Sequence, residues 1–360
     1  MVSMGRNILY VGALWKGATS LDRMHALQEL GCSVASFDTT QYLRSTSRIR
    51  DLFAHHLNWG SPITELNRDL LEFVADEARS VTHVWIDKGK WIAPETLLQL
   101  RALTGAVFIH YTLDPQLVFN RSRHFHRSIP LYDVLFTTKP FEFDLYKEAG
   151  ARKVFLVDQA YDSKRFFPRK LASEEQYMYE SDVCFIGHEE HHYSERLRVV
   201  MKTGGNIKVW GPGWKKYAEA NPWARKCVAG DALWGESYPI ALNAAKIALG
   251  LLTKRYGETT TTRTFEIPAC ETFMLAERTE DHLKLFEEGK EAEFFESDDE
   301  LVDKVRYYLA HATERERIAR AGHERCLKAG YSNMQRMQQV LDLVDSVLSS
   351  GPSIICGAIR

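Results

Sequence analysis

Short apolar runs alternate with amphipathic helical segments along most of this 360-residue chain. The first run, Asn7–Ala13 (NILYVGA), predicts a buried strand, Leu21–Leu30 predicts a helix, and Ser33–Phe37 predicts a second strand. A helix between two such strands returns the chain to the same edge, so the strands become parallel neighbours. The alternation therefore predicts an α/β protein whose ligands bind at the carboxyl ends of parallel strands.

The same pattern predicts most of the remaining elements. Strands are expected at 83–86, 106–111, 133–137, 153–157, 182–186, 207–210, 247–252, 273–276 and 292–295. Helices are expected at 64–78, from Pro94 onward, and at 141–148, 193–201, 238–244, 281–287, 298–309, 312–328 and 333–347. The tail from Ser349 predicts no clear structure.

The alternation stops once and then begins again. The stretch from Gln159 to Glu180 shows no period, and 360 residues exceed what one hydrophobic core usually covers. We therefore expect two Rossmann-like domains in tandem, at 1–160 and 175–330, facing a cleft. The early glycines do not follow the spacing GxGxxG, so the sequence predicts no dinucleotide fingerprint.

Charge and cysteine content narrow the possible functions. The formal net charge of −2 gives no global attraction to nucleic acid or to an anionic membrane, although a local patch could still bind either. Six scattered cysteines without a CxxC pair favour free thiols in a reducing compartment; they are Cys32, Cys184, Cys227, Cys270, Cys326 and Cys356. No signal peptide and no membrane-spanning run is recognisable, so we expect a cytoplasmic protein without a membrane span.

The stretch Tyr256–Glu277 carries the strongest functional signal. It follows an apolar run, 245–252, and opens with a glycine and four threonines before a short helical segment and another apolar run. A loop that enters a helix after a parallel strand is a common phosphate site, because free backbone N–H groups point at the ligand. Candidate ligands for a sugar nucleotide are Lys254, Arg255, Glu258, Thr260, Thr261, Thr262, Arg263 and Glu266. The threonines could instead cap a helix.

Other candidates follow strands of the second domain. Gly187 ends one strand and would permit a ligand to approach closely. Gly211 follows another strand, either as a plain turn or beside a wall for the base made by Trp210 or Trp214. His188–His192 (HEEHH) resembles a metal tract by composition, but its order is not HExxH. We therefore favour a solvated loop and predict no metal site.

The first domain offers further candidates near the ends of its strands. Asp114 follows a strand and could serve as a base or as a hydroxyl ligand. His110 is either a core histidine or a hydrogen-bond partner of the donor sugar. Asp87 and Lys88 are secondary candidates, and Gly12 and Gly17 bound the first loop. In the basic run 120–127, Arg121 and Arg123 could be solvated or could bind an anionic acceptor such as nucleic acid.

Several segments resemble a known family. These are Thr262–Cys270, Phe273–Glu277, Leu285–Phe295, Glu300–Leu309 and Ala319–Gly322. They resemble the C-terminal half of CgeB-like (spore maturation protein) glycosyltransferases, which are of the glycosyltransferase group 1 type and have the GT-B fold. The first half resembles the same group more loosely, through its early glycine loop, Asp114-Pro115 and the junction DQAYDSKRFFP.

The resemblance implies roles for particular residues. It implies a nucleotide-sugar donor in the C-terminal domain, an acceptor in the N-terminal one, and a last helix, 333–348, that crosses back. Glu258 and Glu266 reproduce the family's two glutamates separated by seven residues. The second would bind the donor ribose, and the first would lie near the sugar and its phosphates. Glu271 stands where the family usually has glycine, which puts the fit of this loop in doubt.

The resemblance also implies a reaction. We expect a glycosyltransferase that moves a sugar from a nucleoside diphosphate sugar, with a UDP-sugar favoured, to an acceptor hydroxyl. We expect retention of configuration, no metal and no cofactor; inversion would require Asp114 or His110 as base. The alternatives are a nucleotide-sugar epimerase and an inactive nucleotide-sugar-binding protein. The sequence leaves the sugar, the base, the oligomeric state and the acceptor open: the last could be a glycan, a protein, a small molecule or a nucleic acid base.

Overall fold

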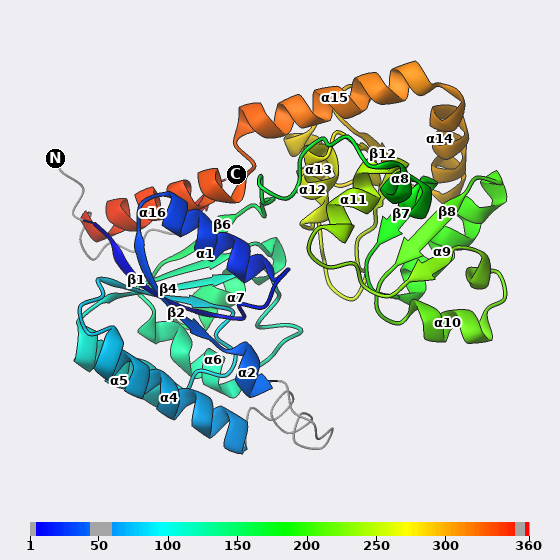
Figure 1. The fold of residues 1–360 in the computed structure, drawn as a ribbon. Coiled ribbons are helices and arrows are strands. Elements are labelled where there is room, and N and C mark those ends of the chain that lie inside the picture. The colour runs from blue at the N-terminus through cyan, green and yellow to red at the C-terminus, as the bar shows by residue number, and fades with distance from the viewer. Residues whose placement is uncertain (1–4, 44–59, 350–356, 360) are drawn as a thin grey trace. The chain divides into compact units, whose positions relative to one another are not determined.

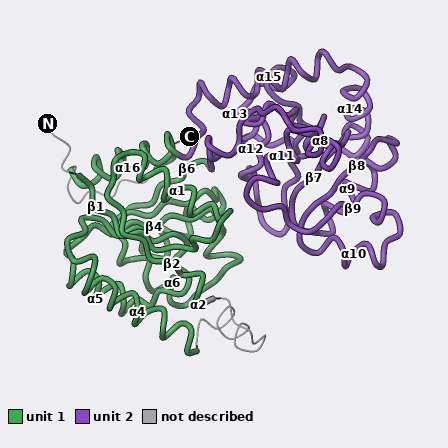
Figure 2. The backbone as a smooth tube through the Cα atoms, in the orientation of Figure 1, with its two compact units in different colours: residues 1–158, 334–360 green, residues 159–333 purple. Residues whose placement is uncertain are grey.

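The computed structural model describes residues 5–43, 60–349 and 357–359. The chain forms two compact units, residues 1–158 with 334–360, and residues 159–333 (Figure 2). Each unit is built on a parallel sheet (Figure 1). The first unit ends at Asp158 and includes the last long helix, α16 (Asn333–Ser349). The parallel sheets confirm the predicted α/β class.

The first unit contains a seven-stranded parallel sheet of order β13-β6-β5-β4-β3-β1-β2. Its strands are β1 (Asn7–Gly12), β2 (Ser33–Asp38), β3 (His83–Asp87), β4 (Val107–Thr112), β5 (Val134–Thr137), β6 (Val154–Val157) and β13 (Gly357–Ile359). The prediction of no structure after Ser349 was wrong at one point, because β13 pairs with β6. Its three residues are too few to show an alternating pattern in the sequence.

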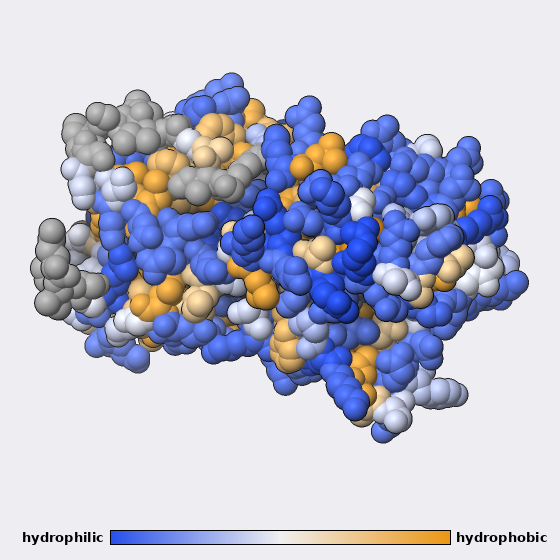
Figure 3. Space-filling view, turned by 90° about the horizontal axis from the view of Figure 1, so that it is seen from above, coloured by the Kyte–Doolittle hydropathy of each residue, from blue (hydrophilic) through white to orange (hydrophobic). Residues whose placement is uncertain are grey.

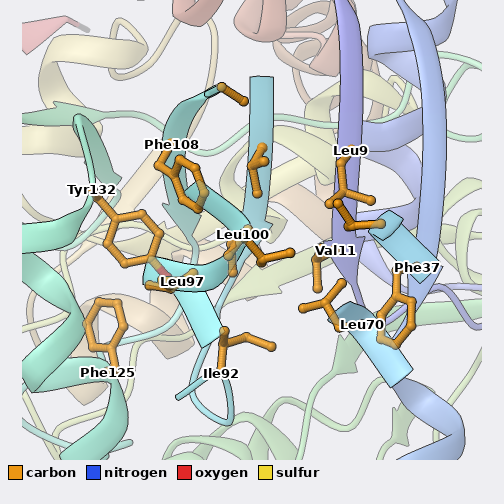
Figure 4. Packing of buried hydrophobic residues seen from close by; sticks show 14 of the residues in the cluster. Leu9, Val11, Phe37, Leu70, Ile92, Leu97, Leu100, Phe108, Phe125 and Tyr132 are labelled. Atoms are coloured by element: carbon orange, nitrogen blue, oxygen red, sulfur yellow. The ribbon is translucent and has the colours of Figure 1, made fainter. Parts of the chain in front are cut away.

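Helices cover both faces of this sheet (Figure 1). They are α1 (Thr19–Glu29), α2 (Thr40–Leu43), α4 (Ser61–Glu77), α5 (Pro94–Thr104), α6 (Arg123–Ser128), α7 (Phe143–Glu148) and α16. Because side chains alternate along a strand, Leu9 and Val11 of β1 pack with Leu70 of α4 on one face (Figure 4). Ile8 and Tyr10 pack with α1 and α16 on the other face.

The second unit contains a six-stranded parallel sheet of order β12-β11-β10-β7-β8-β9. Its strands are β7 (Ser181–Ile186), β8 (Ile207–Trp210), β9 (Val228–Gly230), β10 (Ala245–Gly250), β11 (Phe273–Glu277) and β12 (Glu293–Phe295). Its helices are α8 (Ser173–Tyr179), α9 (His191–Val200), α10 (Trp214–Ala220), α11 (Ser237–Asn243), α12 (Arg263–Ala269), α13 (Glu280–Leu285), α14 (Asp298–Ala310) and α15 (Ala312–Ala329). Apolar clusters fill both faces of this sheet too.

The surface drawn in Figure 3 is mainly hydrophilic, and the described cysteines are buried and unpaired. Hydrophilic residues predominate on the face drawn in Figure 3, and apolar ones form small groups. Five cysteines are buried free thiols, and Cys356 lies outside the described residues. Within the described part of the chain, no helix is both long enough and apolar enough to span a membrane.

Candidate functional site

Two glycines bring the ends of β7 and β8 together in the second unit. A Cβ on Gly211 would lie 1.9 Å from the carbonyl oxygen of Gly187, so only glycine fits there. The Gly187 N–H donates to the Trp210 carbonyl at 2.9 Å, and Trp214 Nε1 donates to the Gly187 carbonyl at 2.8 Å. The loop after β7 is therefore held rigidly at the carboxyl edge of the sheet.

Trp210 does not form the wall of a site. Its side chain is buried in the core and packs against Tyr179 at 6.0 Å between ring centroids. The prediction that it flanks a nucleotide base is therefore wrong for this conformation, because no face of the indole is open to a ligand. Trp214 is buried as well and acts on the site only through its bond to Gly187.

Arg263, the first residue of α12, ties two strand ends together. Its Nη1 donates to the Ile186 carbonyl at 3.3 Å, and its Nη2 donates to the Leu251 carbonyl at 2.8 Å. A Cβ on Gly187 would lie 3.0 Å from Nη1, so Gly187 leaves room for the guanidinium. The buried Nε has no hydrogen-bond partner. Arg263 thus supports the site and keeps one donor unused.

Glu266 lies one turn further along α12 and is buried. Its Oε2 accepts a hydrogen bond from the Tyr238 hydroxyl at 2.7 Å. Burial raises the pKa of Glu266, and the Tyr238 bond with the charges of Arg165 and Arg263 offsets only part of that effect. A buried carboxylate with few hydrogen-bond donors around it can accept further hydrogen bonds from the hydroxyl groups of a ligand.

Glu258 belongs to the loop between β10 and α12 and is partly buried. Its charge acts on Arg263 and on Tyr193, and Arg263 also feels the charge of Glu266. The two glutamates predicted from their spacing therefore act electrostatically on one guanidinium. The structure brings together Glu258, Arg263, Glu266 and Gly187 at one edge of the sheet.

Glu277, at the end of β11, holds Lys254 at this edge. Its Oε2 pairs with the Lys254 ammonium, and its Oε1 accepts from the Leu252 N–H at 2.9 Å and meets His192 Nε2 at 3.0 Å. Burial alone would raise the pKa of Glu277, yet these partners hold that pKa below its usual range. Glu277 is not among the residues predicted from the sequence; its place at a strand end is the signal that was available.

Glu190, just before α9, forms a second buried carboxylate cluster. It meets His188 Nε2 at 2.5 Å and accepts from the Thr253 hydroxyl at 2.6 Å, and Arg255 Nε lies 3.6 Å away. The prediction of a solvated HEEHH loop holds for His188, whose side chain is 53% exposed, but it is wrong for His192, which lies in α9 and pairs with Glu277. Among the described residues, no three His, Cys, Asp or Glu side chains gather in a way that could hold a metal.

The threonines of the loop are partly used in its own structure. The Thr261 N–H donates to the Thr264 hydroxyl at 3.1 Å, which lies 2.9 Å from His282 Nε2. Burial lowers the pKa of His282 to about 4, so this ring is neutral near pH 7. Thr262 occupies the N-cap of α12 but makes no side-chain capping bond. The helix-capping alternative therefore does not describe Thr262, and Thr260 and Thr261 are buried.

The first unit carries a separate cluster after β3. Asp87 is paired with Arg23 at 2.6 Å and accepts from the Tyr10 hydroxyl at 2.9 Å. The next residue, Lys88, has a left-handed backbone with φ 67° and places its ammonium 2.7 Å from Asp114. Backbone strain at a non-glycine residue persists only where its surroundings hold it, and here the Lys88 N–H donates to the Tyr111 carbonyl.

Asp114 is poorly suited to act as a base. Its side chain is 49% exposed. Partial burial would raise the pKa of Asp114, but the ion pair with Lys88 outweighs that effect and holds the pKa below its usual range. The carboxylate can still accept hydrogen bonds from a hydroxyl ligand. The second of the two predicted roles, a hydroxyl ligand, fits this geometry better than the first.

His110 lies in the core and not at the surface of a site. It is fully buried between the rings of Phe125 and Tyr132, whose centroids are 4.5 Å and 5.2 Å away. Burial lowers its pKa to about 4, and its Nε2 lies 3.2 Å from the Lys88 carbonyl. The prediction of a catalytic His110 is wrong for this conformation, because no substrate can reach the ring; the residue instead supports the turn at Lys88.

The loops around this edge contain the remaining candidates. A Cβ on Gly12 would lie 3.2 Å from the Asp87 Cβ, so Gly12 allows close packing there, and Gly17 has φ 103°. Arg121 and Arg123 are exposed. The loop before them is fixed by Glu142, which the sequence did not predict. Its carboxylate accepts three backbone N–H bonds, from Gln116, Leu117 and Val118.

Comparison with known proteins identifies the class. Residues 190–342 match the family described as glycosyl transferase-like. The chain is similar in fold to sucrose-phosphate synthase from Thermosynechococcus elongatus, with 12% identity, a TM-score of 0.66, and coverage of 95% of this chain and 100% of that one. It is also similar to trehalose 6-phosphate synthase from Burkholderia multivorans, with 12% identity, a TM-score of 0.62, and coverage of 97% of this chain and 100% of that one. A third similar structure is HepE from Anabaena in complex with UDP-glucose, with 11% identity, a TM-score of 0.60, and coverage of 94% of this chain and 99% of that one. No curated protein sequence matches the chain.

The fold and the matched domain define an enzyme class: the protein is a glycosyltransferase of the GT-B type. More particularly, residues 190–342 carry the match to the glycosyl transferase-like family. The predicted fold and enzyme class are confirmed, whereas the narrower CgeB-like assignment stays a prediction.

Proposed function

We propose that this enzyme transfers a sugar from a nucleoside diphosphate sugar, with a UDP-sugar favoured, to an acceptor hydroxyl. The observation that carries the proposal is the gathering of Glu258, Arg263 and Glu266 beside the glycine turn at Gly187. This places carboxylates for hydroxyl groups and a cation for phosphate at one sheet edge. HepE, which has a similar fold, binds UDP-glucose, and this supports the choice of base.

Glu266 is assigned to the ribose of the donor. A carboxylate can accept hydrogen bonds from two hydroxyl groups at once, which suits a vicinal diol. Burial raises the pKa of Glu266 more than Tyr238, Arg165 and Arg263 lower it, so hydroxyl donors of a ligand would further stabilise its charged form. Glu258 is assigned to the sugar and its phosphates, because its charge already acts on Arg263.

The departing diphosphate is assigned to the cations of the second unit. Lys254 and Arg255 have side chains that are 54% and 51% exposed, so their charged ends can reach a ligand. Arg263 keeps an unpartnered Nε nearby. Preorganised cations stabilise developing negative charge. We therefore propose that leaving-group stabilisation needs no metal, which predicts full activity in the presence of EDTA.

The state of the first unit favours retention of configuration. Inversion would require a general base for the acceptor hydroxyl. Asp114 is engaged by Lys88, and His110 is buried, so neither side chain suits that role. In a retaining transfer a phosphate oxygen of the donor can assist deprotonation. We assign Lys88 and Asp114 to recognition of the acceptor instead, with Lys88 donating to it and Asp114 accepting from it.

A thermal-shift panel of UDP-, GDP- and ADP-sugars tests the donor site. One donor should raise the melting temperature of the wild type, and the shift should shrink strongly in Glu266→Ala. If no donor stabilises the wild type, or the variant responds equally, the assignment of the site fails. Glu316→Ala, on the surface of α15 at the amino-terminal side of the sheet, is a matched control that should respond as the wild type does.

Product analysis separates the proposed reaction from its alternatives. A transferase releases free nucleoside diphosphate when donor and acceptor are both present. An epimerase would convert the donor alone, and an inactive binding protein would do neither. For the nucleic-acid sub-case, salt-dependent DNA binding should weaken when Arg121 and Arg123 are replaced by Ala. If DNA binding is undetectable at low salt, a nucleic acid acceptor is excluded.

A further inference from the structure

Lys254, an exposed cation of the loop after β10, is held by a carboxylate that also contacts a histidine. Glu277 is 8% exposed and has three partners: Lys254 on Oε2, and His192 and the Leu252 N–H on Oε1. Lys254 comes from the loop after β10, and His192 comes from the first turn of α9. One buried negative charge is therefore shared between a permanent cation and a titratable ring.

A donor diphosphate would compete with Glu277 for Lys254. The lysine side chain is long and flexible and more than half exposed, so its ammonium can turn away from Glu277 without backbone movement. A diphosphate carries more negative charge than one carboxylate, and it offers several oxygen acceptors. The lysine is therefore expected to move to the ligand once the ligand is bound.

When Lys254 moves to the ligand, the buried carboxylate of Glu277 loses the cation that compensates its charge. A buried carboxylate without a compensating cation is unfavourable. The remaining side-chain partner is His192, whose Nε2 already lies 3.0 Å from Oε1. Protonation of that ring from solvent replaces the lost charge without any new contact, and histidine is the side chain that can take up a proton near neutral pH.

We propose that binding of the donor diphosphate is coupled to uptake of one proton by His192, with Glu277 as the positioning residue that links the two events. This inference rests on the proposed function, because it requires a diphosphate at this edge of the sheet. The proton comes from buffer and forms an N–H bond at His192 Nδ1, because Nε2 already faces Glu277; no bond between heavy atoms forms or breaks. Lys254 thus pairs with Glu277 in the free protein and with the diphosphate once the donor is bound.

The other charged groups near His192 do not supply the same coupling. Tyr193, its neighbour on α9, lies 6.1 Å away between ring centroids. The second carboxylate, Glu190, has its own histidine, His188, and its own cation, Arg255. Arg255 Nε lies 3.6 Å from Glu190, beyond hydrogen-bond distance, and the Thr253 hydroxyl donates to Glu190 at 2.6 Å, so Glu190 loses no hydrogen bond to a cation when Arg255 moves. His191 faces solvent with 87% of its side chain exposed, and it provides a matched control.

Calorimetry with UDP-glucose tests the proposal. UDP-glucose is the probe because its diphosphate does not titrate near pH 7. Titrations at pH 7 in buffers of different ionisation enthalpy give the number of protons bound per ligand. The wild type and His191→Asn should take up a fraction of a proton, whereas His192→Asn should take up none. Lys254→Met should also take up none and should bind about tenfold more weakly, as expected for loss of a charged hydrogen bond.

Glu277→Gln provides a second, less disruptive variant. Its amide oxygen can still accept from the Leu252 N–H, but it has no charge to hold Lys254. This variant should bind UDP-glucose at least as tightly as the wild type and without proton uptake. Binding by the wild type with no proton uptake, or equal uptake by His192→Asn, overturns the coupling and leaves the donor site intact. Absence of any UDP-glucose binding would overturn both the coupling and the proposed UDP-sugar donor.

Discussion

Glu271 shows at the residue scale how a departure from a family pattern is accommodated. It has φ 55°, so it adopts the left-handed conformation for which the family's glycine is suited. The turn still forms, because the Glu271 N–H donates to the Pro268 carbonyl at 2.9 Å. The substitution therefore changes the energy of the backbone at the end of α12 and not its path.

Glu271→Gly should stabilise the protein by about 1 kcal/mol, because glycine adopts a positive φ without the steric cost of a Cβ. The midpoint of urea denaturation measures the change. Glu271→Ala is the matched control: it also removes the contact with Arg320, 3.8 Å away, but keeps the Cβ, and should give no gain. Equal gains from both variants would show that the side chain, and not the backbone, is unfavourable.

Two buried histidines predict a specific loss of stability in acid. Burial lowers the pKa of His110 and of His282 from 6.5 to about 4. Unfolded chains bind these protons near pH 6.5 and the folded protein does not, so their contribution is complete above pH 6.5 and is lost as pH falls towards 4. Each ring then costs about 3 kcal/mol of unfolding free energy across that range.

Urea denaturation at several pH values tests this prediction. His282→Asn should be less stable than the wild type at pH 7, yet its stability should fall less steeply between pH 6.5 and 4.5. His191→Asn, an exposed histidine, should follow the wild-type profile. A profile for His282→Asn that runs parallel to that of the wild type would mean that the ring is protonated in the folded protein.

At the scale of elements, the sequence predicted those strands and helices that can be recognised from their own apolar pattern, without knowledge of the elements that pack against them. Apolar runs such as the one in β10 predict a buried strand from their own composition. Several elements were missed because their segments show no clear apolar period, and one of them, β9, is partly exposed; they include β9, β13, α6, α8 and α10. Such elements form when a neighbouring strand or helix stabilises them, which local pattern cannot show.

The sequence shows local patterns but not contacts between distant elements, and this also explains which residues of the candidate site were predicted and which were missed. Glu258, Arg263 and Glu266 were predicted because they share one loop and helix, so their spacing is visible in the sequence. Glu277 and Glu190 were missed because their partners come from other elements. His110 was placed at a site because it stands near a strand end; Phe125 and Tyr132, which bury it, are distant in sequence.

The contact between the loops after β7 and β8 makes a prediction about these elements. Gly211→Ala should destabilise the second unit by about 3 kcal/mol, because its Cβ would meet the Gly187 carbonyl at 1.9 Å. It should also abolish the thermal shift given by the donor. Gly204→Ala is the control, since Gly204 has φ 78° and nothing within 4 Å of the added Cβ. It should cost only about 1 kcal/mol and leave the shift unchanged.

At the scale of the whole molecule, two units of similar architecture place different chemistry at their strand ends. In the second unit, the carboxyl edge holds buried glutamates with exposed cations. In the first unit, it holds ion pairs that are already matched, Arg23 with Asp87 and Lys88 with Asp114. Matched pairs suit a neutral hydroxyl ligand, and exposed cations suit a diphosphate. The assignment of donor and acceptor to separate units follows from this difference.

Hydrogen exchange with and without UDP tests that assignment across the molecule. UDP should slow exchange in the second unit, at residues 186–189 and 251–266, because a ligand suppresses local opening of the segments that hold it. It should leave residues 87–89 and 112–118 of the first unit unchanged, since these are assigned to the acceptor. The same measurement on Glu266→Ala controls for non-specific effects and should show little protection. Protection confined to the first unit would reverse the assignment of the two units, because the diphosphate would then bind where the ion pairs are already matched.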